Sequence, residues 1–181
     1  NAAPPQPADV DMSGLRFDPT RDSNLFTSLD ISGKWTASTW IKYTDTVTSS
    51  SINWVFCDPG NQGLRLKPDN QKLYYYYGSG NDLILSDAVI SSNEWTHIVL
   101  SYDGSEFVVY INGQLSGTTP MPGTVNFDEI SIGLWDSDNV FNGYMSEFYF
   151  VQNQVLGPIV FGKSINNGTW VPKNNTEIKA V

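Results

Sequence analysis

Short runs of alternating apolar and polar residues cover most of the chain between residues 14 and 151. In the run 129–134, for example, Ile130, Ile132 and Leu134 share one face, which is typical of a strand buried on one side. Gly, Asp, Asn and Pro separate the runs, and no convincing helix of about ten residues or more interrupts them. The pattern predicts strands within residues 14–17, 35–43, 52–57, 63–67, 72–77, 82–86, 95–102, 106–112, 114–118, 129–134 and 143–151.

Residues 94–114 carry the clearest turn signals. Asp103-Gly104 and Asn112-Gly113 each lie between two apolar alternating runs. Both dipeptides tolerate the positive φ that tight hairpins require, so three successive antiparallel strands are expected here. Many short strands with regular turn signals favour an all-β fold, a two-sheet antiparallel β-sandwich of one domain.

Composition narrows the choice of partners. The 181 residues carry a net charge of -9 and a sequence pI near 4.3, which disfavours a nucleic-acid or anionic membrane partner. An acidic surface suits divalent cations and neutral glycans. Cys57 is the single cysteine, so no intrachain disulfide forms, and we expect it to be a buried apolar residue.

Three blocks carry a family resemblance: WTASTWIKY at 35–43, NEWTHIVLSYDGSEFVVYINGQLSG at 93–117 and ISIGLWDSDNVFNGYMSEFYFVQNQVLGP at 130–158. In order and spacing they resemble the concanavalin A-like jelly roll of laminin-G-like and pentraxin-like domains, over roughly residues 14–158. The resemblance implies a jelly-roll domain at 13–158, followed by a C-terminal extension at 159–181 that packs back on the sandwich. Residues 1–12 combine Pro, Ala and acidic residues without periodicity, which predicts an extended N-terminal arm.

The two ends of the domain show a narrower resemblance. They are similar to laminin-G-like modules in virion proteins of marine tailed phages, where a Leu-x-Pro-like step, Phe-Gly and Trp-x-Pro follow the last strand. Those positions are Leu156, Phe161, Gly162, Trp170 and Pro172 in this chain. The resemblance implies a fibre, appendage or capsid-decoration protein on the virion surface, in contact with other virion proteins or copies of itself as a homo-oligomer.

Within that picture, Trp170 is expected to cap an open end of the sandwich. Host-surface glycans are a further expected partner of such a module. The alternative is a calcium-dependent, lectin-like carbohydrate-binding domain of a secreted or cell-surface protein.

Catalysis is not expected. Glucanases of similar architecture place carboxylates on one strand face as Glu-x-Asp-x-Glu, and this chain has no such run. Asp128 and Glu129 are adjacent, which points them to opposite faces. His97 is the only histidine, and no Gly-x-Ser-x-Gly elbow accompanies it, so we expect a structural role for it.

A calcium site is predicted in the loop after the run 129–134. Asp136, Asp138 and Asn139 crowd oxygen donors there, and Asp58 from a neighbouring loop is expected to add a ligand. Asp and Asn are also ordinary turn formers, so a purely structural polar turn remains the other interpretation.

Four consecutive tyrosines, Tyr74 to Tyr77, must present rings on both faces of a strand. We expect Tyr75 and Tyr77, together with Trp135, to meet a ligand or a neighbouring subunit. Stacking on sugar rings and packing in an interface both remain open.

Overall fold

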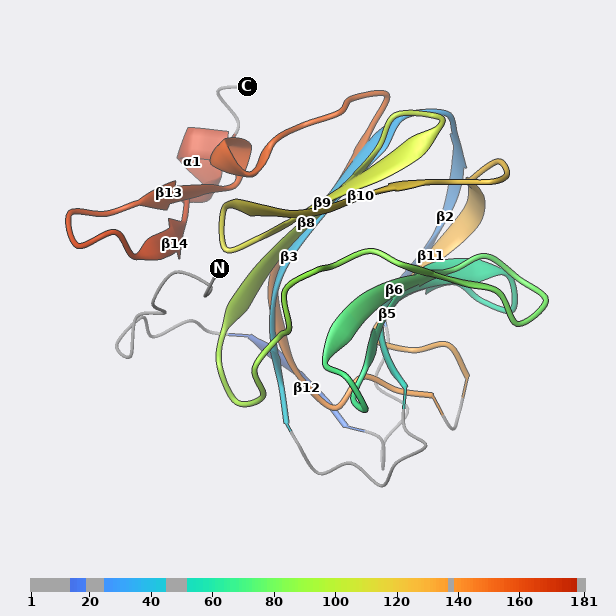
Figure 1. Cartoon of the computed structure of the whole chain (residues 1–181), viewed down its shortest axis with the longest axis horizontal. Helices are drawn as coiled ribbons and strands as arrows, with labels where there is room; N and C mark the ends of the chain where they lie inside the picture. Colours follow the sequence, from blue (N-terminus) through green and yellow to red (C-terminus); the bar gives the residue numbers. More distant parts are fainter. Residues whose placement is uncertain (1–13, 19–24, 45–51, 137–138, 179–181) are drawn as a thin grey trace.

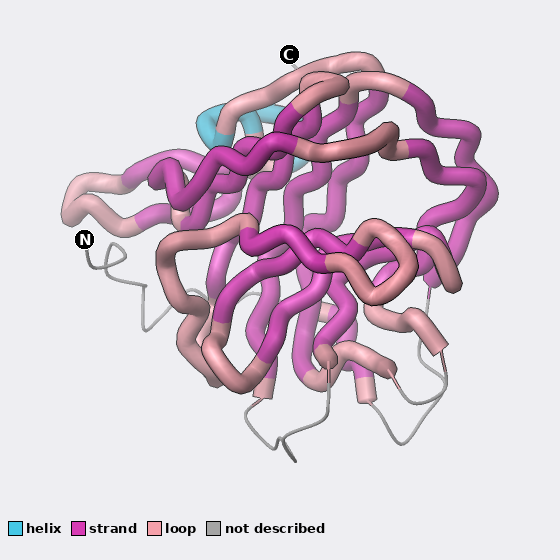
Figure 2. The backbone as a smooth tube through the Cα atoms, turned by 45° about the vertical axis from the view of Figure 1, so that its right-hand side comes forward, coloured by secondary structure: helices cyan, strands magenta, loops and turns pink. Residues whose placement is uncertain are grey.

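Two antiparallel sheets of six strands each lie face to face in the computed structural model, which describes residues 14–18, 25–44, 52–136 and 139–178 (Figures 1 and 2). The first sheet has the strand order β1 (Leu15–Phe17), β12 (Gly143–Gln152), β3 (Trp35–Tyr43), β8 (Thr96–Tyr102), β9 (Glu106–Ile111) and β10 (Gln114–Pro120). The second has the order β2 (Leu25–Ser32), β11 (Asn126–Ile132), β4 (Asn53–Asp58), β5 (Gln62–Lys67), β6 (Lys72–Tyr76) and β7 (Asp82–Ile84). The predicted all-β two-sheet sandwich is confirmed.

Strand β2 is the main element that the hydrophobic pattern did not reveal. Its sequence, LFTSLDIS, begins with Leu25 and Phe26, two adjacent apolar residues that are both exposed. Its pairing with β11 is also interrupted by a register shift between Phe127 and Glu129. A bulge breaks the period-two alternation, which explains why this strand escaped prediction.

The predicted three-stranded meander of β8, β9 and β10 is present. Asn112 and Gly113 have φ values of 49° and 79°, as a two-residue hairpin with both central residues at positive φ requires. In the preceding turn, the Asp103 carboxylate accepts hydrogen bonds from the backbone N–H groups of Ser105 (2.8 Å) and Glu106 (2.9 Å). Local turn chemistry therefore sets the register of these strands.

Aromatic rings fill the space between the sheets. Trp35 on β3 is fully buried, and its ring lies 5.2 Å from that of Phe150 and 5.6 Å from that of Phe127. Phe127 belongs to the second sheet, so these contacts join the two layers. Cys57 is buried as predicted, and its thiol donates to the Leu134 carbonyl at 3.0 Å.

The chain beyond β12 runs back over the outer face of the first sheet. It contains η1 (Pro158–Val160), the hairpin β13 (Gly162–Ser164) and β14 (Trp170–Pro172), and the short helix α1 (Asn175–Ile178). Thr36 and Ser101 bond to the backbone carbonyls of Gln154 (2.9 Å) and Leu156 (2.8 Å). Both faces of β3 and β8 are consequently buried, and Figure 1 shows the hairpin beside β8 and β9.

Trp170 does not cap an open end of the sandwich, and that expectation is wrong. Its indole packs against His97 on the outer face of β8 and against the glycines at 113 and 162. A Cβ at Gly113 or Gly162 would lie 2.6 or 2.5 Å from the ring, so both positions need glycine for this approach. The helices of the described chain are too short to cross a membrane.

Candidate functional site

The outer face of the second sheet carries a continuous set of large side chains. The strand register aligns Trp54 with Arg65, Arg65 with Tyr74, and Tyr74 with Ile84 across β4, β5, β6 and β7. Because neighbouring side chains in such a row point the same way, they stack against one another. Among the described residues, no hairpin folds over these four strands, in contrast to the first sheet.

Three aromatic rings form the centre of this face. Trp54 and Trp135 are stacked with centroids 4.0 Å apart and an interplanar angle of 20°. Tyr76 stands at right angles to both, with its centroid 5.3 Å from Trp135 and 5.8 Å from Trp54. We call Trp54, Tyr76 and Trp135 the aromatic cluster. Trp54 is buried at its base, whereas Tyr76 and Trp135 are half-buried and form its outer part.

Cations and one carboxylate hold the base of the cluster in place. The Arg65 guanidinium lies 5.2 Å from the ring centroid of Trp54 and 4.9 Å from that of Tyr76. It also forms an ion pair with Asp82, to which Lys67 is bound at 2.7 Å. Two cations thus share one anion in a poorly hydrated setting, which fixes the orientation of the rings.

A tight loop places Trp135 on the sheet. The Trp135 N–H donates to the Asn139 carbonyl at 3.0 Å, and the Asn139 N–H donates to the Asp136 carbonyl at 3.1 Å. A bridge between Leu134 and Val140 closes the loop. Trp135 is therefore oriented both by its own backbone and by the Trp54 ring beneath it.

The structure corrects the assignment of the tyrosines. Tyr75 is fully buried, its hydroxyl donates to Gln62 Oε1 at 3.1 Å, and its ring lies 4.3 Å from that of Phe107. Burial raises the pKa of Tyr75 well above its usual value. Tyr77 is half-buried and also packs against the core. The outward tyrosines are Tyr74 and Tyr76, because strand parity is the reverse of the one we expected.

Of the predicted calcium ligands, the structure brings Asp136 and Asn139 into contact. Asp58 pairs with Gln62 at the end of β4, which places it on the inner side of the sheet, and it accepts from Asn61 Nδ2 at 3.0 Å. Burial raises the pKa of Asp58. Asp136 lies in the loop over the outer face and accepts from Asn139 Nδ2 at 2.8 Å.

Asp138 lies outside the described residues. Within the described ranges, no group of three His, Cys, Asp or Glu side chains could hold a metal ion. The calcium site in this loop therefore stays a prediction.

His97 forms the other polar cluster, on the first sheet. Trp170 Nε1–H donates to His97 Nδ1 at 2.9 Å, so Nδ1 carries no proton and the proton of the neutral ring is on Nε2. Nε2 then donates to the Ser38 hydroxyl at 2.9 Å. Burial lowers the pKa of His97 to about 3. A nitrogen that already carries a proton cannot accept one from Ser38, so this pair is not an activated nucleophile.

The sequence predicted a functional role for Trp135 but not for the other residues of this site, Trp54, Arg65 and Tyr76. Arg65 could have been found, since it stands between Leu64 and Leu66 in an alternating run that turns it outward. Trp54 could not, because a register shift between Trp54 and Phe56 breaks the alternation there. The face of the sheet on which Tyr76 lies depends on which tyrosines enter the core, and the sequence left that open.

Comparison with protein families agrees with the fold. Residues 20–157 match a family model (Laminin_G_3) described as the concanavalin A-like lectin/glucanases superfamily. The chain belongs to this family, and the expected concanavalin A-like jelly roll is confirmed. No curated protein sequence matches the chain significantly.

Solved structures of the same fold include proteins of varied role. Domain 4 of AbnA, an extracellular arabinanase of Geobacillus stearothermophilus solved with arabinotriose, is 22% identical with a TM-score of 0.54, over 70% of this chain and 66% of that one. The heptameric SAP-like pentraxin of Limulus polyphemus is 17% identical with a TM-score of 0.58, over 75% and 73%.

The receptor-binding domain of botulinum neurotoxin D is 15% identical with a TM-score of 0.55, over 75% of this chain and 39% of that one. The chain thus spans less than two thirds of the arabinanase domain and of the neurotoxin domain. At these identities the likeness concerns the fold.

Proposed function

We propose that this domain is a non-catalytic carbohydrate-binding module. The aromatic cluster carries the proposal. The face of an indole or phenol ring is electron-rich, and it attracts the weakly positive C–H groups that line one side of a sugar ring. Trp135 and Tyr76, set at right angles, offer one ring face for stacking and a second to flank the sugar.

Recognition by this site is passive. Trp135 is held by the Trp54 ring and by the hydrogen bond from its backbone N–H to the Asn139 carbonyl (3.0 Å). Tyr76 is held by the hydrogen bond from the Gly80 N–H to its hydroxyl (3.2 Å). A site whose side chains are already ordered spends little binding free energy on fixing them. The structural neighbours include an arabinanase domain solved with arabinotriose, which supports a sugar as the ligand class.

The positions and partners of the acidic residues support a non-catalytic role. A retaining or inverting glycosidase needs two carboxyl groups on either side of one sugar bond. On the aromatic face, the Asp82 carboxylate is engaged by two cations, Arg65 and Lys67. His97 and Ser38 are both buried, and Trp170 of the C-terminal hairpin lies against His97.

A place on a virion surface, as a fibre, appendage or decoration protein, is the context we propose for this module. Its support is the sequence resemblance of the tail, where Phe161, Gly162 and Trp170 occupy the positions of the phage modules. In this chain, these residues anchor the extension on the first sheet. The second candidate is a calcium-dependent lectin of a secreted protein, favoured by the oxygen-rich loop beside Trp135.

A glycan array followed by titration calorimetry tests the sugar site. We expect the wild-type chain to bind at least one neutral glycan, and Trp135→Ala to lose that binding. Tyr144→Ala is the matched control, because Tyr144 is an exposed ring on the first sheet and should not affect binding. Equal binding by the Trp135→Ala chain would refute this site. Release of reducing sugar from the bound glycan would refute the non-catalytic role.

A further inference from the structure

Two of the rings on the outer face of β4 and β6 are covered by the chain itself. Trp54 is only 2% exposed, because the indole of Trp135 stacks on it. Tyr74 is only 7% exposed, since Lys67 Nζ lies 4.3 Å from its ring centroid and Asn70 Nδ2 donates to its hydroxyl at 2.6 Å. Neither ring therefore offers a face on which a sugar could stack.

The two half-buried rings of the aromatic cluster do not lie in one plane. Tyr76 and Trp135 are perpendicular, with centroids 5.3 Å apart, and the Arg65 guanidinium lies 4.9 Å from the Tyr76 centroid. Beyond Tyr74 the register row ends at Ile84, which is 54% exposed but has no ring. A flat polysaccharide surface needs several coplanar rings spaced along it, whereas this part of the described chain offers one accessible indole face, that of Trp135.

Tyr76 adds a hydrogen-bond donor beside that indole. Its hydroxyl oxygen accepts from the Gly80 N–H at 3.2 Å. A phenol that accepts one hydrogen bond still has its own O–H to donate, and a sugar hydroxyl or ring oxygen is a suitable acceptor. The turn 77–81 holds this hydroxyl in place, since the Asn81 N–H donates to the Gly78 carbonyl at 3.0 Å. One stacking face and one directed donor are enough to orient a single sugar ring.

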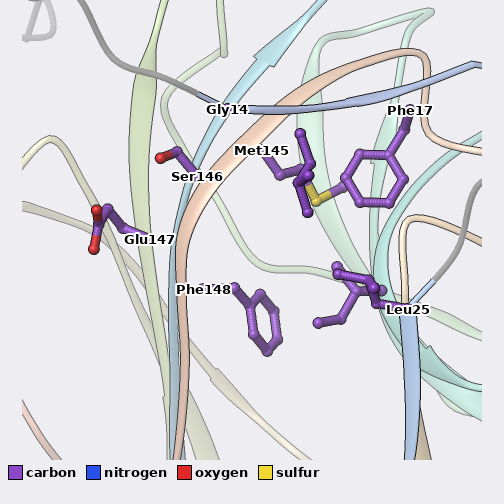
Figure 3. A pocket seen from close by; sticks show the side chains of 9 residues that line it. Gly14, Phe17, Leu25, Met145, Ser146, Glu147 and Phe148 are labelled. Carbon is purple, nitrogen blue, oxygen red and sulfur yellow. The ribbon is translucent and has the colours of Figure 1, made fainter.

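The pocket at the β1/β2 edge is a poor match for a sugar. It has a volume of about 360 Å³ and lies between β12 and β2. Figure 3 shows Phe17, Leu25 and Met145 directed into it, whereas Ser146 and Glu147 point to the other side of β12. A sugar buried among apolar side chains would leave its hydroxyl groups without partners, which costs free energy for each group. The indole on the sheet face is the better match.

We infer that the sugar site takes one terminal residue of a glycan chain, and not a stretch within a linear or crystalline polysaccharide. This inference rests on the proposed function and narrows its ligand class. One face of the terminal sugar lies on Trp135, and Tyr76 donates its O–H to a hydroxyl or ring oxygen of the same sugar. The rest of the glycan makes no stacking contact with the sheet, so its length has little effect on affinity.

A glycan array with paired probes tests this inference. The probes are immobilised glycans of one to six sugar units, each with its natural terminal residue and with that residue capped by one further, different sugar. We expect bound glycans to share a terminal residue, to differ less than about threefold in affinity whatever their length, and to lose about tenfold or more on capping. Crystalline cellulose should not retain the protein.

Variants distinguish a single sugar contact from a longer row of rings. Tyr76→Phe keeps the ring but removes the O–H, so it should weaken binding about three- to tenfold, the contribution of one hydrogen bond. Tyr74→Leu removes a covered ring and Phe26→Ser removes an exposed ring on β2, and both chains should bind as the wild type does. Circular dichroism shows whether each variant is folded, and the exposure of Phe26 makes unfolding by its replacement unexpected.

An affinity that rises about tenfold or more between one and six units would overturn the inference and leave the proposed function intact. Bound glycans that share only an internal residue, or retention on crystalline cellulose, would do the same. Loss of binding by folded Tyr74→Leu or Phe26→Ser would also overturn it, because a longer row of rings would then contact the glycan. Absence of binding to every glycan would refute the proposed function itself, and this inference with it.

Discussion

Trp170 donates its indole N–H to Nδ1 of His97 at 2.9 Å, and the centroids of the two rings are 6.0 Å apart. On β3, Trp40 stacks on the same imidazole with centroids 4.9 Å apart. The contact joins the C-terminal hairpin to the middle of the first sheet. It makes residues that follow β12 part of the folded unit.

Replacing Trp170 with Phe is expected to destabilise the protein by about 1–3 kcal/mol. The ring still fills most of the space, but the buried Nδ1 of His97 loses its donor. Urea unfolding measures the change. Trp170→Ala should cost more, about 3–5 kcal/mol, because a cavity is added to the lost hydrogen bond.

Tyr144→Phe is the control for this pair, since its ring is exposed on β12. If Trp170→Phe unfolds at the wild-type urea concentration, the hydrogen bond makes no net contribution. Limited proteolysis of Trp170→Ala should also release the extension first.

Burial of neutral His97 predicts a loss of stability in acid. The pKa of His97 is about 3 in the folded chain and about 6.5 when unfolded, so below pH 6.5 only the unfolded chain takes up this proton. The contribution is complete above pH 6.5 and declines as the pH falls toward 3. Between pH 7 and pH 4 the free energy of unfolding should drop on the order of 3 kcal/mol from this group.

Carboxylates also contribute to the change in the free energy of unfolding in acid, and their contribution must be separated from that of His97. Hydrogen bonds from Glu106 and Ser105 lower the pKa of Asp103, so its contribution is also lost as the pH falls. Comparison with His97→Gln cancels such groups, because both chains retain them. The variant should be less stable at pH 7 but should show a shallower pH dependence, and parallel pH profiles would contradict a buried neutral His97.

The ion pair under the aromatic cluster predicts an asymmetric response to mutation. Asp82→Leu leaves Arg65 buried without its anion and should cost about 3–5 kcal/mol. The double variant Arg65→Met with Asp82→Leu removes both charges and should recover most of that loss. Thermal unfolding of the four chains in the cycle measures the coupling, and additive effects would show that the two side chains act independently.

The predicted calcium site can be tested by thermal unfolding with and without calcium. If the loop binds calcium, added calcium should raise the Tm of the wild-type chain, and Asp136→Ala with Asp138→Ala should abolish that rise while leaving the fold intact. Glu94→Ala, at an exposed acid before β8, is the control and should keep the rise. An equal Tm with and without calcium in the wild-type chain would count against the site.

How far the sequence predicts this molecule depends on how local each signal is. The Asp-Gly and Asn-Gly turns set the β8–β9–β10 register from within a few residues, and they were predictable. Which of the residues Tyr74 to Tyr77 face inward depends on which rings meet Phe107 across the sandwich. No local sequence pattern encodes that choice. The same holds for Trp54, whose outward position follows from a bulge, and for Trp170, whose partner lies 73 residues away.

The C-terminal hairpin makes the two outer faces of the sandwich different. One broad surface is already occupied by the chain's own tail, so a support attached on that side would not hide Trp135 or Tyr76. Copies fixed in this way on a common scaffold would all present their rings outward, and many individually weak contacts would then act together.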